Sequence, residues 1–171
     1  QSGLSWSTIL KKREAFRNAF ASFIPEAVAA FTDQDRERLM QDAGIVRNKR
    51  KIDAAITNAQ AVIVLRSALA AESDAHRAGR VDGAPLAQLL RPRQPYPRHL
   101  GELAWLYQPS YQPRPANAGE VPAQTEESRA LSAELKRRGF VFVGPVTTLA
   151  LMSAIGIVNT DILGTWKRPS N

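Results

Sequence analysis

Apolar residues recur three and four positions apart along the first part of the chain, which is the spacing of side chains on one face of an α-helix. The pattern predicts successive helices over residues 8–21, 25–31, 34–42 and about 49–71. Pro25 suits the first turn of the second helix. Thr32 or Asp33 is expected to cap the third helix and Asn48 the fourth, with Gly44 ending the third.

The predicted helices each carry an apolar face. Leu39 and Met40 are expected to point inward from the third helix. The fourth helix has a longer stripe, made of Ile52, Ala55, Ile56, Ala59, Val62 and Ile63. These faces predict one shared hydrophobic core among helices.

The pattern changes over residues 72–120, where prolines cluster. Proline lacks a backbone donor and disfavours helix at the residue before it, so this stretch is predicted to be mostly loop. A short helix over 100–107 is expected to bury Leu103, Trp105 and Leu106. Two further helices are predicted over 125–138, closed by Gly139, and over 145–155, where apolar residues nearly all round indicate a central position.

No strand pattern and no internal repeat is evident, so the expected fold is all-α and compact. A length of 171 residues is enough for one good core, and a single domain over 1–171 with a long proline-rich loop is expected. Residues 72–98 have the character of an insertion.

Composition narrows the possible partners. Lys and Arg number 23 against 16 Asp and Glu, so the formal net charge is 23 − 16 = +7. Such a charge favours a polyanion, either nucleic acid or an acidic membrane surface. There are no cysteines, and the two histidines lack metal-ligand spacing. No apolar run approaches the length needed to cross a bilayer, and no leader is visible. A cytoplasmic protein is therefore the default expectation.

The helix–glycine–helix unit from Asp35 to Lys51 resembles a helix-hairpin-helix and is one candidate site. A tight glycine turn followed by a helix N-terminus can direct backbone N–H groups at a DNA phosphate. Basic side chains gather at the same place: Arg47, Lys49, Arg50 and Lys51. The alternative is an ordinary joint between two helices with a solvated basic face.

Aromatic and apolar residues supply further candidates. Trp6 could stack on a cationic alkylated purine, or it could be a core tryptophan that anchors the first helix. Leu4 could fill the gap left by a flipped nucleotide, or it could be a core leucine. Phe140 and Phe142 are interpreted as core residues, with pocket exposure as the alternative. The run from Lys136 to Arg138 either contacts phosphate or merely ends a helix.

Taken together, these segments resemble the DNA-3-methyladenine glycosylase I family of the helix-hairpin-helix glycosylase superfamily. The resemblance rests on six stretches: Gly3-Leu4-Ser5-Trp6, Leu10-Lys11-Lys12-Arg13-Glu14, Asp42-Ala43-Gly44-Ile45, Lys51-Ile52, Gly139-Phe140 with Phe142-Val143-Gly144, and Val158-Asn159. It implies an all-helical enzyme that flips a damaged nucleotide out of duplex DNA and hydrolyses its N-glycosidic bond. It also implies that Trp6 stacks on the base, that Gly3 and Leu4 approach the gap in the duplex, and that residues 44–51 grip the backbone.

The resemblance also implies departures from the family. The family's conserved glutamate, its aromatic pocket residues and its first zinc ligands would precede Gln1, so the catalytic residues are unknown and the sequence is expected to begin inside the family's motif. Asp161 and Thr165 stand where a zinc-binding histidine and cysteine belong, so no zinc and no other cofactor is expected. Leu149 and Ala150 replace polar or aromatic residues, which predicts a larger or more apolar pocket.

Three functions remain open at this point. The first is a base-excision repair glycosylase acting on alkylated purines such as 3-methyladenine. The second is a catalytically inactive DNA-binding relative, and the third is a helical interaction module whose charge is incidental. The first implies double-stranded DNA with alkylated bases as partner, a monomer without membrane contact, and a cytoplasmic, nucleoid-associated location.

Overall fold

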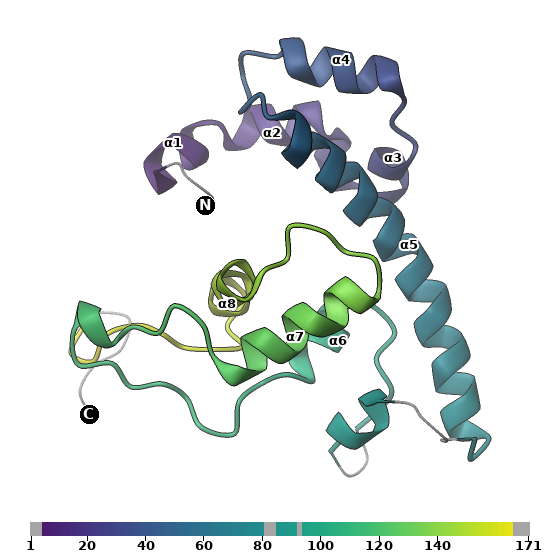
Figure 1. The fold of residues 1–171 in the computed structure, drawn as a ribbon, viewed down its shortest axis with the longest axis vertical. Coiled ribbons are helices and arrows are strands. Elements are labelled where there is room, and N and C mark those ends of the chain that lie inside the picture. The colour runs from purple at the N-terminus through teal and green to yellow at the C-terminus, as the bar shows by residue number, and fades with distance from the viewer. Residues whose placement is uncertain (1–4, 81–84, 92–93, 166–171) are drawn as a thin grey trace. The chain divides into compact units, whose positions relative to one another are not determined.

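The computed structural model describes residues 5–80, 85–91 and 94–165, which are helical with connecting loops and, within those ranges, contain no β-strand. Figure 1 shows the order of the helices along the chain. Their bounds are α1 Trp6–Lys11, α2 Arg13–Ala19, α3 Pro25–Ala29, α4 Asp33–Gln41, α5 Lys49–Arg77, α6 Leu100–Trp105, α7 Glu126–Arg137 and α8 Pro145–Ala154. Short 3₁₀ turns occupy Ala21–Phe23, Pro85–Leu89 and Ala118–Glu120. The predicted all-α fold is therefore confirmed.

The helices fall into two compact units. The first unit takes in the chain through Ala68 together with Lys136–Phe142, and the second takes in Leu69–Leu135 and the chain from Val143 onward.

Phe20 lies at the centre of the core of the first unit. Its ring lies 6.3 Å from Phe16, 5.8 Å from Phe23 and 6.3 Å from Phe31, centroid to centroid. Around it pack side chains from α2 to α5, namely Ala19, Val28, Leu39, Ile45, Ile52, Ile56 and Ala59. Leu39 is fully buried as predicted, whereas Met40 is 37% exposed, so the prediction that both point inward was wrong for Met40.

The predicted first helix is broken at Lys12, where α1 ends and α2 begins. A second break follows α2, because Ala21, Ser22 and Phe23 all have positive φ, at 48°, 56° and 58°. For residues other than glycine this conformation costs about 1–2 kcal/mol each. The stacked Phe20 and Phe23 rings help to hold the turn, which redirects the chain into α3.

The long helix α5 extends to Arg77, beyond the predicted end near residue 71, so part of the stretch predicted as loop is helical. Its composition and length are sufficient to cross a bilayer, contrary to the expectation from sequence. Ile52, Ile56 and Ala59 are buried in the core of the first unit, whereas Val64 is 65% exposed. Ile63, predicted to be part of the same stripe, is 37% exposed.

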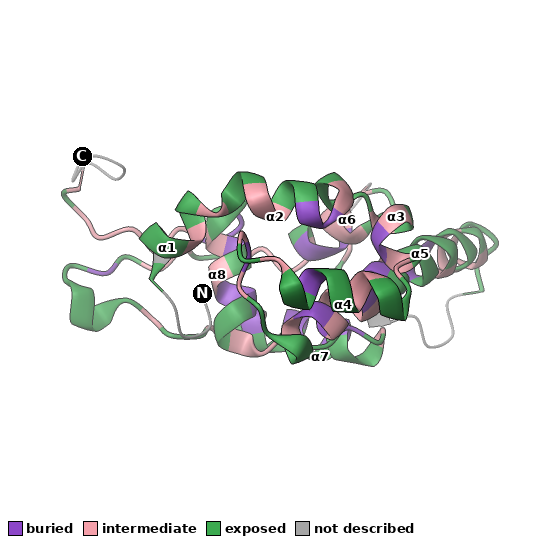
Figure 2. Ribbon diagram, turned by 90° about the horizontal axis from the view of Figure 1, so that it is seen from above, coloured by how far each residue is buried: buried purple, intermediate pink, exposed green. Residues whose placement is uncertain are grey.

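The second unit has its own buried residues, contributed by α6, α7, α8 and the loops that join them. Among them are Leu86, Leu103, Leu131, Met152, Ile157 and Val158. Figure 2 colours the buried, half-buried and exposed stretches of the helices, including α6, α7 and α8. Two predictions fail here: Trp105 is 43% exposed rather than buried, and α8 exposes Val146, so it is not buried all round.

A glutamine side chain holds the chain after α8. The Gln112 amide donates to the Ile157 carbonyl at 3.1 Å and accepts from the Asn159 N–H at 2.7 Å. Leu163 adds a backbone bond by donating to the Pro115 carbonyl at 2.9 Å. Two side-chain hydrogen bonds and one backbone hydrogen bond thus attach the proline-rich loop to the C-terminal segment.

Candidate nucleic-acid interface

The first candidate segment begins at α1. The Ser5 hydroxyl accepts from the Thr8 N–H at 3.2 Å and so caps the helix. This cap makes Trp6 the first residue of α1. The Trp6 side chain, Gly3 and Leu4 lie outside the described residues, so their assigned roles stay predictions.

The second candidate segment is the turn between α4 and α5, residues 42–48, called the hairpin below. Thr32 begins α4 with a capping box, in which its hydroxyl accepts from the Asp35 N–H and the Asp35 carboxylate accepts from the Thr32 N–H. Asn48 caps α5 as predicted, its Oδ1 accepting from the Lys51 N–H at 3.2 Å. Between the two caps, Ile45 is buried and anchors the hairpin in the core.

Gly44 has a different role from the one predicted. It does not end α4 in a left-handed conformation, because α4 ends at Gln41 and Gly44 is not among the glycines with positive φ. Its N–H donates to the Asp42 carboxylate at 2.7 Å. A Cβ at this position would lie 2.9 Å from that carboxylate and 3.1 Å from the Ala15 Cβ. Glycine is required here by close approach.

The basic side chains of the hairpin and α5 are not equivalent. Arg47 and Arg50 are exposed, and neither forms an ion pair within the described part of the chain. Lys49 donates to Asp53 at 2.8 Å, and Arg36 approaches the same carboxylate at 3.2 Å. The Lys49 ammonium, with Arg36, holds the pKa of Asp53 below its ordinary value. Arg47 and Arg50 are therefore the cations most available to a phosphate.

The two candidate segments are joined by a residue that the sequence argument did not single out. Lys12 donates from Nζ to the carbonyls of Ala43 and Gly44, at 2.9 and 3.0 Å. Sequence spacing gives no signal for a contact between residues this far apart along the chain. The structure thereby connects the break between α1 and α2 with the hairpin.

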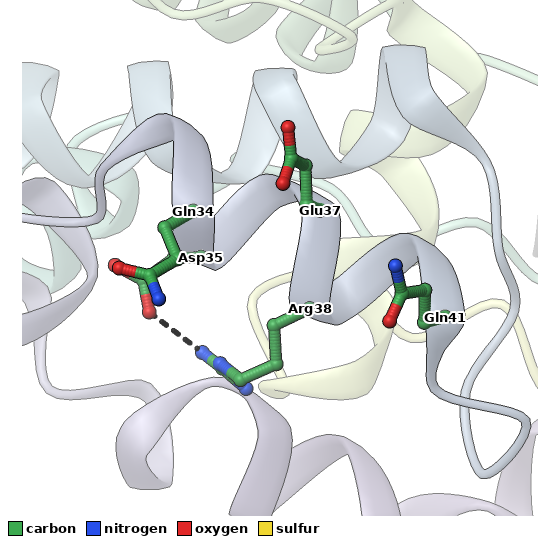
Figure 3. Close-up of a pocket in the computed structure, with 5 residues that line it drawn as sticks. All are labelled: Gln34, Asp35, Glu37, Arg38 and Gln41. Carbon is green, nitrogen blue, oxygen red and sulfur yellow. Dashed lines mark hydrogen bonds and ion pairs between the residues drawn. The ribbon is translucent and has the colours of Figure 1, made fainter.

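A hollow of about 480 Å³ lies along α4 and is lined by Gln34, Asp35, Glu37, Arg38 and Gln41. Figure 3 shows these side chains on one helix, with Arg38 paired to Asp35 at 3.1 Å. Arg38 also donates to the Ala19 carbonyl and lies 5.4 Å from the Phe31 ring centroid. Two carboxylates and no aromatic side chain make this hollow a poor site for a nucleobase or a phosphate.

Of the two phenylalanines interpreted as core residues, only Phe140 is buried. Phe142 is 56% exposed and has φ of 57°, so the core interpretation was wrong for it. The preceding residue is fixed to α5, because the Asn58 amide donates to the Val141 carbonyl at 3.0 Å and accepts from its N–H at 2.8 Å. Lys136 is exposed in the last turn of α7.

An all-helical fold with a basic hairpin is typical of many DNA-binding proteins. Comparison with known proteins identifies the family within that class. A model of the methyladenine glycosylase family matches residues 1–88 and 87–168. The chain therefore belongs to the methyladenine glycosylase family. It is accordingly a DNA glycosylase, an enzyme of base-excision repair.

Individual relatives agree with the family model. DNA-3-methyladenine glycosylase 1 of Escherichia coli strain K12 is 37% identical over 174 residues, which cover 100% of this chain and 78% of that protein. A crystal structure of 3-methyladenine DNA glycosylase I matches with a TM-score of 0.75 and 33% identity, over 99% of this chain and 79% of that one. A Staphylococcus aureus structure described as showing the basis of 3-methyladenine recognition matches with a TM-score of 0.75 and 28% identity, over 100% and 77% of the two chains.

Proposed function

We propose that this protein removes N3-alkylated adenine from duplex DNA by flipping the nucleotide out of the helix and hydrolysing its N-glycosidic bond. The observation that carries the proposal, together with membership of the family, is the contact between Lys12 and the hairpin. In one compact unit, the helix that begins with Trp6 is connected through Lys12 to a basic hairpin and the capped start of α5.

The hairpin supplies the grip on the DNA backbone, as a helix-hairpin-helix would. Gly44 lets the hairpin pack tightly against α2, and the N-terminus of α5 presents the positive end of its helix dipole. Arg47 and Arg50 add exposed charge at the same place. Lys49 and Lys51 contribute less, because Lys49 already pairs with Asp53 and Lys51 is half-buried. Contacts of this kind position the protein without reading sequence.

The base is recognised by stacking. An adenine alkylated at N3 carries a positive charge, and an indole face attracts a cation placed over it. Trp6 takes this role, while Leu4 fills the space that the flipped nucleotide leaves and Gly3 lets the chain approach the duplex. The neutral normal base gains no such cation–π attraction, so stacking itself favours the damaged base.

The chemistry makes modest demands on the protein. When the C1′–N9 bond breaks, its electron pair moves into the purine ring and cancels the positive charge, so the base leaves as a neutral molecule. A water oxygen forms the new bond to C1′ and loses its proton. The protein's contribution is to extract the base, orient it and admit water at one face.

We propose further that the C-terminal segment works without zinc. A structural zinc site takes four Cys or His ligands, and this chain has no cysteine. At the two family ligand positions stand Asp161 and Thr165, and the Thr165 hydroxyl donates to the Ile162 carbonyl at 2.8 Å. These donors do not fit a zinc clip. The two hydrogen bonds of the Gln112 amide and the backbone bond between Leu163 and Pro115 hold the segment instead.

The enzyme is proposed to act as a monomer in the cytoplasm, at the nucleoid, without membrane contact. The burial of Ile52, Ile56 and Ala59 of α5 in the core of the first unit and the basic charge of the chain support this setting.

Replacing Trp6 with alanine tests the stacking role. Single-turnover release of free base from methylated duplex DNA should fall at least about tenfold, since stacking on one base is worth roughly 1–3 kcal/mol. Binding to undamaged duplex should change little, because the hairpin supplies it. Trp105→Ala, which removes an exposed tryptophan, is the matched control and should leave both quantities unchanged. Equal losses of excision and of undamaged-duplex binding in Trp6→Ala would refute the role.

A further inference from the structure

Lys12 occupies an unusual position at the joint between two helices. It ends α1 and precedes α2, with φ of −94° and ψ of 4°. Its side chain is half-buried, whereas its neighbours Lys11 and Arg13 are exposed. From this joint the ammonium reaches two successive carbonyls of the hairpin, those of Ala43 and Gly44. In a run of three cations, one is therefore directed at the protein's own backbone.

A packing contact between Gly44 and Ala15 lies beside the hydrogen bonds of Lys12. Gly44 lies so close to α2 that a Cβ on it would be 3.1 Å from the Ala15 Cβ. Ala15 follows Lys12 by three residues, so both lie on the same side of the first turn of α2. The hairpin is thus fixed to α2 at two neighbouring points, by packing at Ala15 and by hydrogen bonds at Lys12.

The hydrogen bonds of Lys12 complete those of the turn. The peptide between Ala43 and Gly44 donates its N–H to the Asp42 carboxylate at 2.7 Å and gives its carbonyl to Lys12. The next peptide donates the Ile45 N–H to the Asp42 carbonyl at 3.4 Å and also gives its carbonyl to Lys12. Both peptide units are satisfied at both ends, and removing the ammonium would leave two carbonyls of the turn without this donor.

We propose that Lys12 is a positioning residue that fixes the DNA-gripping hairpin to the helix carrying Trp6, so that backbone binding and base stacking occur in one register. The proposal rests on the function proposed above for these two segments. The charge of Lys12 acts inside the protein, on the carbonyl dipoles of the hairpin, and not on the DNA. Lys12 therefore contributes to how the duplex is held rather than to how strongly its phosphates are attracted.

Salt dependence separates these two contributions. Each phosphate contact that is lost lowers the slope of log K against log salt by about 0.9 for duplex DNA. A residue that positions the hairpin changes affinity or excision without changing this slope. Lys11, which is adjacent and exposed, provides the matched comparison for a lysine on the surface.

The test compares Lys12→Met with Lys11→Met, since methionine keeps most of the aliphatic stem and removes the donor. For Lys12→Met we expect excision of 3-methyladenine at saturating enzyme to fall about tenfold or more, as small misplacements near chemistry do. The salt slope of duplex binding should stay unchanged, and the amides of Gly44 and Ile45 should exchange faster. Lys11→Met should keep the excision rate within about twofold.

Two results would overturn the proposal: a salt slope reduced by about one in Lys12→Met, which would make Lys12 a phosphate ligand, or excision and amide exchange equal to those of the wild type. Should Lys12→Met fail to fold, Lys12→Arg keeps the charge but changes the donor geometry, and the same three readouts apply to it. A wild-type protein that releases no base would defeat the proposed function alone, because amide exchange at Gly44 and Ile45 still reports the Lys12 contact.

Discussion

At the residue scale, Asp53 determines which cations at the start of α5 are available to bind phosphate. Its carboxylate receives Lys49 at 2.8 Å and Arg36 at 3.2 Å, so it neutralises part of the charge at the start of α5. The remaining exposed cations are Arg47, which lies in the hairpin, and Arg50, which lies in the first turn of α5. A mixture of paired and unpaired cations concentrates the attraction for phosphate at one point instead of spreading it over the helix.

The pH dependence of stability follows from the direction of the shift. The pKa of Asp53 is lowered from 3.8, chiefly by the hydrogen bond from Lys49, so the folded state binds this proton more weakly than the unfolded state does. Its stabilisation is therefore present above the ordinary pKa and is lost as pH falls through the lowered value. Asp53→Asn should be less stable than wild type in urea unfolding at pH 7. The gap should narrow below about pH 4, and a gap that is constant down to pH 2.5 would contradict this assignment.

Residue patterns predicted some of these features and not others. The capping preferences of Thr32 and Asn48 act within three residues, so the starts of α4 and α5 could be predicted. The direction of Met40 could not be, because adjacent apolar residues share a helical stripe and only the neighbouring helices decide which is covered. Lys12 was missed because its partners lie 31 and 32 residues away.

At the scale of elements, the hairpin depends on the close approach of Gly44 to two side chains, those of Asp42 and Ala15. Gly44→Ala places a Cβ 2.9 Å from the Asp42 carboxylate and 3.1 Å from the Ala15 Cβ, so either the turn or α2 must move. The expected cost is about 1–3 kcal/mol in the free energy of unfolding, with weaker duplex binding. Urea unfolding of the purified variant measures it.

Gly101→Ala is the control for that substitution. Gly101 is the second residue of α6, and alanine is a better helix former than glycine by up to about 1 kcal/mol. The nearest atoms to its added Cβ belong to the exposed His99 ring, at 3.3 Å, which caps α6 and need shift only slightly. A smaller cost than that of Gly44→Ala is expected. Equal costs for Gly44→Ala and Gly101→Ala would show that close approach is not what requires glycine at the hairpin.

Element boundaries mark the limit of prediction from periodicity. Helix 8–21 was predicted as continuous because its apolar spacing is regular, yet the chain breaks at Lys12, where the side chain is drawn to the hairpin. Helix α5 was predicted to end near residue 71, where polar residues begin, but it continues to Arg77. Tyr96 from the proline-rich stretch covers that extension by donating to Glu72 at 2.6 Å. In both places a contact distant in sequence overrides the local pattern.

At the scale of the molecule, the net charge of +7 attracts DNA, but we assign the productive contacts with DNA to the N-terminal end of α5. Arg50→Ala should lower the salt slope of duplex binding by about 0.9. Arg66 lies roughly 24 Å further along the same helix and pairs with Glu26. Arg66→Ala should leave the slope unchanged. If the two variants had equal effects, the charge would act diffusely and the hairpin would not be the grip.

Under the proposed function, this chain keeps the reaction of its family although Asp161 and Thr165 stand at the expected zinc-ligand positions. The most direct test measures release of free 3-methyladenine from methylated duplex DNA under single-turnover conditions. The released base is quantified by chromatography, and zinc is removed by a chelator. We expect release of 3-methyladenine, undiminished by the chelator, and no release from unmethylated duplex. No released base, alongside salt-sensitive duplex binding, would contradict it and identify a DNA-binding relative without the chemistry.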